Sequence, residues 1–257
     1  MNSVEFTTDF QKMEIEYGLF DLQTVDGIFF WDMIRHDIFY LIFRNKIESK
    51  KSNSYISEKH RYHILNRFFT LLRFLISDFI YLLKNINSDY LVIACSRNLI
   101  NSKPKDIILD DYLKIIERSS FIIETNSINK TSDRFSNKLL NLMTKMNYIK
   151  ASDLGFDLSE LINNRYELNI DVTQFVIERI QKFRSERQYY LILLKLIRPK
   201  LVFIVQNGIQ KGLFMACKEL KIKTVELQHG YVNYTHPAYS YPKLLNVSNE
   251  KQINLPY

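Results

Sequence analysis

The residues best suited to chemistry are concentrated near the C-terminal end of the sequence. The run 224–231 reads Thr-Val-Glu-Leu-Gln-His-Gly-Tyr, and the run 236–242 reads His-Pro-Ala-Tyr-Ser-Tyr-Pro. The unperturbed pKa of a histidine is ~6.5, so a neutral His229 can accept a proton at cellular pH. Glu226 is suited either to orient that imidazole or to be the base itself. Gly230 lets the chain turn sharply and bring backbone N–H groups close to a ligand.

The elements around this stretch predict a strand, a helix and a second strand in succession. Residues 199–208 form a short apolar run that closes with Asn-Gly, residues 210–220 have apolar side chains at helical spacing, and a second predicted strand ends within Glu226–His229. In parallel α/β sheets, ligands bind beyond the carboxyl ends of the strands. We therefore expect residues 206–208 and 228–230 to lie along one edge of a sheet.

The rest of the chain alternates predicted helices and strands. An earlier buried strand ends in Ser96 and Arg97, which should emerge at the same edge. The order of elements predicts a three-layer, Rossmann-like α/β domain with a mostly parallel sheet. The predicted elements before residue 199 are strands over 88–97 and 121–126 and helices over 29–44, 62–83, 106–118, 135–146 and 171–196.

Trp31 and Arg35 lie four residues apart on the first predicted helix. Residues at this spacing share a helix face, so the guanidinium and the indole can stack. Two interpretations stay open: a core tryptophan beside an exposed arginine, or an arginine directed at a substrate.

The predicted helix over 62–83 is the most apolar segment of the chain. A membrane span needs about 20 residues nearly free of charge, and Arg73 and Asp78 interrupt this one. The helix is therefore expected to pack on the sheet. Its breadth of apolar surface and its flanking basic residues also suit contact with a membrane surface, and both interpretations are kept.

Composition narrows the setting. The 257 residues are 46% hydrophobic, which is ample for a buried core, and carry a net charge of +7. Cys95 and Cys217 each lie inside an apolar run, which favours buried thiols in a reducing compartment over a disulfide. The N-terminus lacks the pattern of a signal peptide, so we expect a cytoplasmic protein. The positive charge suits nucleic acid, anionic lipid or phosphorylated substrates, but no nucleic-acid-binding module is recognisable.

Several common site patterns are absent from the sequence. It contains no His-Glu-x-x-His, no Cys-x-x-Cys and no Gly-x-Ser-x-Gly, and neither of the glycine-rich nucleotide loops. We therefore expect no metal, no cofactor and no independent nucleotide site.

Four stretches resemble a known family. Glu-Leu-Gln-His-Gly followed by His-Pro-x-Tyr-x-Tyr-Pro resembles the end of the N-terminal domain of bacterial GT-B-fold glycosyltransferases that build capsule or other surface polysaccharides. The stretch 26–35, Asp-Gly-Ile-Phe-Phe-Trp-Asp-Met-Ile-Arg, is similar to the opening of that family. Residues 91–97 and 106–111 are similar to its first inner strand and the acidic stretch after it.

The resemblance covers most of the chain but only half of such an enzyme. It implies that residues 1–257 are a single acceptor-side α/β domain and that a missing or separate domain holds the nucleotide-sugar donor. The acceptor would be a growing glycan, lipid-linked and at the inner face of the membrane. The implied catalytic residues are His229 and Glu226. The expected substrate contacts, from the resemblance and from the sheet edge, are Arg35, Ser96, Arg97, Asn207, Gln228, Gly230, Tyr231, His236, Tyr239 and Tyr241.

Other interpretations stay open. The polar run around His229 also suits a capped strand end, and the tyrosines after it also suit packing of aromatic rings across a loop. The chain could then be a non-catalytic glycan- or partner-binding module, or a remnant of a split glycosyltransferase. Whether it is active alone is left open.

Overall fold

The computed structural model describes residues 3–24, 27–47, 64–94, 98–100, 103–105, 109–116, 119–125, 134–136, 139–140, 157–205, 210–227 and 240–242. The chain divides into two compact units. Unit 1 comprises Met1–Ile56, Asn147–Phe183 and Tyr231–Leu255, and unit 2 comprises Ser57–Met146, Arg184–Gly230 and Pro256–Tyr257. The expectation of one domain over 1–257 stays a prediction, because a division by contacts does not decide whether either unit folds alone.

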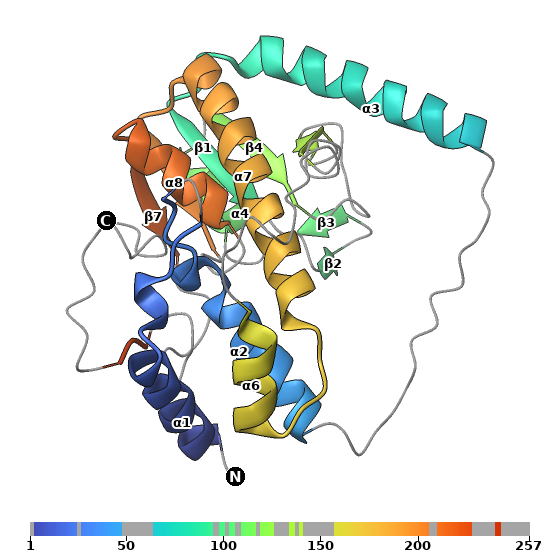
Figure 1. The fold of residues 1–257 in the computed structure, drawn as a ribbon. Coiled ribbons are helices and arrows are strands. Elements are labelled where there is room, and N and C mark those ends of the chain that lie inside the picture. Colours follow the sequence, from blue (N-terminus) through green and yellow to red (C-terminus); the bar gives the residue numbers. More distant parts are fainter. Residues whose placement is uncertain are drawn as a thin grey trace. The chain divides into compact units, whose positions relative to one another are not determined.

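Unit 1 is helical in the part that the structure describes (Figure 1). Its core is a cluster of aromatic rings, in which Phe39 meets Phe6 and Phe10 edge-on at centroid distances of 4.9 and 5.3 Å. Such pairs add to the stabilisation that comes from burial alone. Its elements are α1 (Ser3–Glu16), the 3-10 helix η1 (Leu19–Asp21), α2 (Trp31–Ile47), α6 (Leu158–Tyr166) and the first part of α7 (Val172–Ile197).

The sequence predictions contain neither α1 nor α6. Helix α1 buries Phe6, Phe10 and Met13, which lie at spacings of four and three and so form one narrow helical stripe. Helix α6 begins at an N-cap, where the Asp157 side chain accepts a hydrogen bond of 2.8 Å from the backbone N–H of Ser159. Helix α1 has few apolar residues and α6 has only nine residues in all, so the helical pattern of each is weak outside the folded context.

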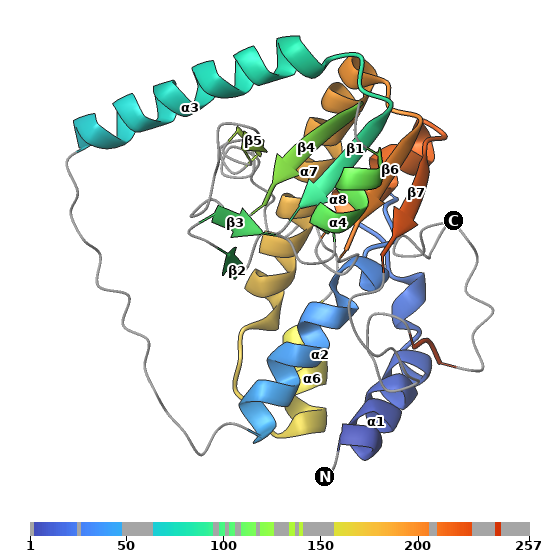
Figure 2. The same ribbon diagram turned by 180° about the vertical axis from the view of Figure 1, so that it is seen from behind.

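Unit 2 is built on a parallel sheet (Figure 2). Among the described residues, five strands pair in the order β5-β4-β1-β6-β7, and every pairing is parallel. The predicted parallel, Rossmann-like α/β class is therefore confirmed. The strands are β1 (Tyr90–Ala94), β4 (Ser120–Glu124), β5 (Phe135–Ser136), β6 (Leu201–Ile204) and β7 (Lys223–Glu226).

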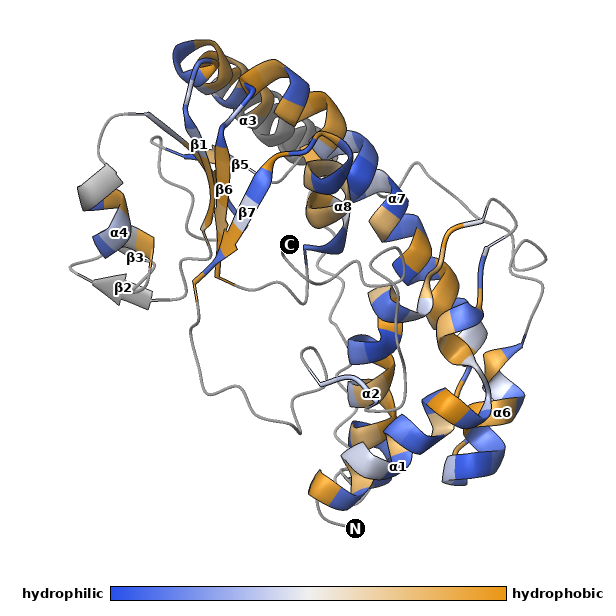
Figure 3. Ribbon diagram, turned by 90° about the vertical axis from the view of Figure 1, so that its left-hand side faces the viewer, coloured by the Kyte–Doolittle hydropathy of each residue, from blue (hydrophilic) through white to orange (hydrophobic). Residues whose placement is uncertain are grey.

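Both faces of this sheet are covered by helices. Leu91 and Ile93 of β1 face the larger core, which α7 and α8 (Lys211–Glu219) complete, whereas Val92 and Ala94 face α4 (Leu109–Ile116). Successive residues of a strand point to opposite faces, so an unbroken apolar strand requires cover on both sides. Figure 3 shows the apolar β1 and β6 between α4 on one side and α8 on the other.

Two short pairings differ from the sequence predictions. Phe135 and Ser136 form β5 beside β4 instead of beginning a helix over 135–146, and residues 141–146 lie outside the described part. Ser136 is held there by Asp78 of α3 (Ile64–Asn85), whose carboxylate accepts from the Ser136 backbone N–H at 2.9 Å. The antiparallel pair β2 (Asn98–Ile100) and β3 (Lys103–Lys105) was also not predicted.

Helix α8 approaches the second half of α7 very closely at Gly212. A Cβ atom added to Gly212 would lie 2.3 Å from the Cβ of Glu186 and 2.6 Å from the backbone nitrogen of Arg187. The close approach brings the Gly212 N–H to a Glu186 carboxylate oxygen at 3.4 Å. Only a residue without a side chain allows these helices to pack in this way.

Gly212→Ala should therefore lower the free energy of unfolding by about 2–3 kcal/mol, because the new methyl group forces backbone and side chain apart. Urea denaturation followed by circular dichroism measures this loss. Lys218→Ala, on an exposed position of the same helix, is the control and should change stability by less than about 0.5 kcal/mol. Equal effects of the two substitutions would show that the helices separate at little cost.

Cys217 is buried, as predicted, whereas Cys95 lies outside the described residues. Burial raises the pKa of the Cys217 thiol from its usual 9.0 to about 12. The folded state therefore holds this proton more tightly than the unfolded state, and the associated stability is lost as the pH rises from about 9 towards 12.

In a Cys95→Ser background, we expect Ellman's reagent at pH 8 to leave Cys217 unmodified in the native protein, since the thiolate is the reactive form. The same reagent should modify Cys217 at once in denaturing urea. Rapid modification without denaturant would contradict the burial of this thiol.

Candidate functional site

The carboxyl edge of the sheet is where an α/β domain of this kind binds ligands. At this edge Ala94 of β1 lies beside Glu124 of β4, and Ile204 of β6 lies beside Glu226 of β7. The chain leaves β1 towards β4 through α4 on one face, and leaves β6 towards β7 through α8 on the other face. The strand order thus reverses between β1 and β6, and that point of the edge is the expected crevice.

Only one of the predicted edge residues lies in the described part of the chain. Glu226 is the last residue of β7 and is half-buried. The next residue keeps the strand end in place, because the Leu227 N–H donates to the Ile204 carbonyl at 2.8 Å. Outside the described residues lie Ser96, Arg97, Asn207, Gln228, His229, Gly230, Tyr231, His236 and Tyr239. The strands that several of them follow, β1, β6 and β7, do end together at one edge as predicted.

A second carboxylate at this edge was not predicted as a functional residue. Glu124 ends β4, is buried, and lies 2.8 Å from the Arg134 guanidinium. The next residue, Thr125, donates from both its backbone N–H and its hydroxyl to the Ala94 carbonyl at 2.9 Å. The negative charge of Glu124 is thus balanced inside the protein. The predicted strand over 121–126 contains Glu124 without ending at it, and nothing in the polar stretch that follows indicated Arg134 as its partner.

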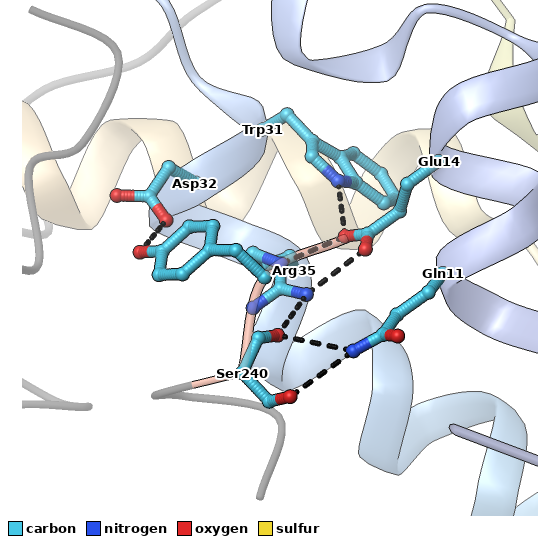
Figure 4. A network of polar contacts seen from close by, with 7 residues as sticks. Gln11, Glu14, Trp31, Asp32, Arg35 and Ser240 are labelled. Atoms are coloured by element: carbon cyan, nitrogen blue, oxygen red, sulfur yellow. Dashed lines mark hydrogen bonds and ion pairs between the residues drawn. The ribbon is translucent and has the colours of Figure 1, made fainter. Parts of the chain in front are cut away.

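A buried polar cluster lies in unit 1 and centres on Arg35 (Figure 4). One Glu14 oxygen accepts from Arg35 Nε at 2.7 Å and from Trp31 Nε1 at 2.7 Å, and the other accepts from Arg35 Nη2 at 2.9 Å. The side chains of Arg35 and Glu14 are 1% and 0% exposed. Two parallel hydrogen bonds between charged groups make this the strong, bidentate form of an ion pair.

The segment 240–242 is tied to the same cluster. Arg35 Nη2 donates to the Ser240 carbonyl at 3.0 Å although 205 positions separate the two residues. Gln11 Nε2 donates to the Ser240 hydroxyl at 3.1 Å, and the Tyr241 hydroxyl donates to Asp32 at 2.6 Å. The Tyr241 ring also lies 4.8 Å from the Arg35 guanidinium carbon, close enough for a cation–π contact. The structure therefore brings together two of the predicted substrate contacts, Arg35 and Tyr241.

Burial by itself lowers the pKa of the Arg35 guanidinium, but the Glu14 carboxylate outweighs burial, and the pKa is raised above its usual value. Arg35 is thus a fixed cation. The interpretation of Arg35 as an exposed residue is wrong, whereas that of Trp31 as a core residue is confirmed. The predicted closeness of the two side chains takes the form of a shared partner, since both donate to Glu14. A substrate contact of Arg35 stays a prediction.

The sequence predictions did not include the partners of Arg35, because these residues lie far from it in the chain. Glu14 lies on α1, a helix that the sequence predictions lack, and it is 21 positions from Arg35. A carboxylate directly after the buried Met13 was the available signal. Gln11, Asp32 and Ser240 gave none, because no local sequence pattern distinguishes them from polar residues that face solvent.

Comparison of the chain with models of protein families, with curated protein sequences and with solved structures gives no match. The fold and its edge define the class of protein: a Rossmann-like α/β domain with a parallel sheet and flanking helices. In the described part of the chain, no three His, Cys, Asp or Glu residues are placed to hold a metal ion.

Glu14→Gln should lower the free energy of unfolding by about 3–5 kcal/mol, because the neutral amide leaves the buried Arg35 charge without its partner. Urea denaturation of the full chain measures this. Glu16→Gln provides a matched control on the same helix, since Glu16 is exposed and pairs with Arg165 at the surface. That substitution should cost less than about 1 kcal/mol. If the two variants were equally stable, the buried pair would contribute no more than a surface one.

Proposed function

We propose that this chain is the acceptor-side domain of a GT-B glycosyltransferase that builds a bacterial surface polysaccharide. The observation that carries the proposal is the position of Glu226 at the carboxyl end of β7, next to the end of β6. Gln228, His229 and Gly230 follow directly in the sequence. This is the edge at which α/β domains bind ligands, and the sequence motif that includes Glu226 is the one that resembles the family.

The proposed reaction joins an acceptor hydroxyl to the anomeric carbon of a donor sugar. The hydroxyl oxygen forms the new bond, the bond from the anomeric carbon to the nucleotide phosphate oxygen breaks, and the hydroxyl proton passes to a base on this domain. His229 is proposed as that base, with Glu226 either orienting it or taking the proton itself. A second domain would hold the nucleotide and stabilise its departing phosphate.

The buried cluster in unit 1 holds Ser240 and Tyr241, which directly follow the aromatic stretch in the sequence. Ser240 and Tyr241 are engaged with Arg35, Gln11 and Asp32. The proposal therefore gives Arg35 and Tyr241 a positioning role: they anchor the end of the stretch that contains Tyr231, His236 and Tyr239, which are proposed to contact the acceptor.

Saturation-transfer NMR on the full 257-residue chain, with a panel of bacterial surface oligosaccharides and a panel of nucleotide sugars, tests the proposal. We expect binding of an oligosaccharide and none of a nucleotide sugar. Glu226→Gln and His229→Ala should each weaken oligosaccharide binding about tenfold or more, as expected for loss of a hydrogen bond to a charged group. Glu160→Gln, an exposed position on α6, is the control and should leave binding unchanged.

Three results would overturn the proposal. Failure of the folded chain to bind any oligosaccharide would remove the acceptor role. Nucleotide-sugar binding that is lost in His229→Ala would place the donor site on this chain and reverse the division of labour. Oligosaccharide binding that survives both site variants would favour a glycan-binding module whose site lies elsewhere.

A further inference from the structure

Helix α3 carries a stripe of large apolar side chains in solvent. Ile76, Phe79, Ile80 and Leu83 are 54, 60, 48 and 57% exposed. Their spacing of three, one and three places them on one face of the helix over two turns. Scattered apolar residues on a surface are normal, whereas a contiguous patch of this kind marks an interaction site.

The opposite face of α3 is fixed to the sheet. The buried Asp78 carboxylate accepts hydrogen bonds from both the backbone N–H and the hydroxyl of Ser136 in β5. The Tyr81 hydroxyl accepts from the Ile122 N–H at 3.0 Å, and its ring meets Phe121 edge-on at 5.1 Å. These contacts set the rotation of α3 about its own axis. The exposed stripe therefore lies on a different face of α3 from the residues that contact the sheet.

The charges of this segment indicate what covers the stripe. Between residues 64 and 85 the sequence has three basic residues, Arg67, Arg73 and Lys84, and one acidic residue, Asp78. The Asp78 carboxylate faces Ser136 in the sheet. All the other charged residues of this helix are basic. The preceding stretch 50–63 adds four more basic residues against one acidic residue. A positive helix with an apolar stripe is complementary to an anionic lipid surface.

The same charges disfavour a second copy of this chain as the partner, since two such helices would bring positive charges together. Crossing of the bilayer is also disfavoured: within the described helices, α3 included, none is long and apolar enough to span a membrane. We propose that α3 lies in the plane of an anionic bilayer, with Ile76, Phe79, Ile80 and Leu83 inserted below the headgroups. This inference does not depend on the proposed glycosyl transfer.

Co-sedimentation of the full chain with vesicles tests the proposal. We expect binding to phosphatidylcholine vesicles that contain phosphatidylglycerol, weaker binding to phosphatidylcholine alone, and a decrease with added salt. The double variant Phe79→Ser/Leu83→Ser should lower the partition coefficient about tenfold or more, because two large apolar side chains no longer insert. The matched control is Ile192→Ser/Leu196→Ser, which removes two exposed apolar residues at the same spacing from α7. It should change binding less than about twofold.

Tryptophan fluorescence detects insertion directly and does not depend on the loss of vesicle binding in the double variant. In Phe79→Trp the new indole is exposed, whereas the native Trp31 is buried. We expect its emission to shift to the blue on addition of anionic vesicles and to be quenched by brominated lipid, and we expect neither effect for Ile192→Trp.

Three outcomes would overturn the proposal. They are unchanged vesicle binding by the α3 double variant, equal loss in the α7 control, and absence of lipid quenching at position 79. A dimer in light scattering that the α3 variant converts to a monomer, with vesicle binding unaffected, would instead assign this face to a contact between copies. None of these results depends on oligosaccharide binding, so this proposal and the proposed function fail separately.

Discussion

The ion pair between Glu14 and Arg35 is the interaction on which unit 1 depends. Removing two charges from water costs several kcal/mol for each, and only good geometry with further hydrogen bonds offsets that cost. Here the pair is bidentate, and Trp31 and the Ser240 carbonyl take up remaining hydrogen-bonding capacity of Glu14 and Arg35. The pair therefore fixes α1, α2 and segment 240–242 at one point, because each of them supplies a group that the buried charges require.

Unit 2 depends on a different constraint, the burial of its sheet on both faces. Helices close over β1 from both sides, and polar side chains are accommodated where the strands end. Two carboxylates reach that edge under contrasting conditions. Glu124 is buried and its charge is balanced by Arg134, whereas Glu226 is half-exposed on a strand that the Leu227 N–H holds in register. A partly exposed carboxylate can contact a ligand and a buried one cannot, which is why the proposed function is assigned to Glu226 and not to Glu124.

Strong apolar patterns were enough to predict β1, β4, β6, β7, α3, α7 and α8 from the sequence. Elements whose stability comes from tertiary contacts were missed: α1 buries a stripe of three residues, and β5 has two residues beside a sheet edge and a contact with Asp78. The same limit applies to the site. The spacing of Trp31 and Arg35 correctly placed them together, but no local pattern indicates a partner 21 or 205 positions away. The edge followed from topology, because parallel strands end side by side.

Asp78 shows how one residue reconciles two requirements on α3. An ionised carboxylate directed at lipid would be costly, and a serine N–H and hydroxyl at the sheet edge would be unsatisfied without a partner. Because the Asp78 carboxylate faces Ser136, it accepts hydrogen bonds from the serine N–H and hydroxyl, and it does not lie on the outer face of the helix. What is left on the outer face is the apolar stripe, in a segment whose remaining charges are basic. A helix that only covered the sheet would gain nothing from Phe79 and Leu83 in water, and their exposure is the observation on which the proposed insertion into a bilayer rests.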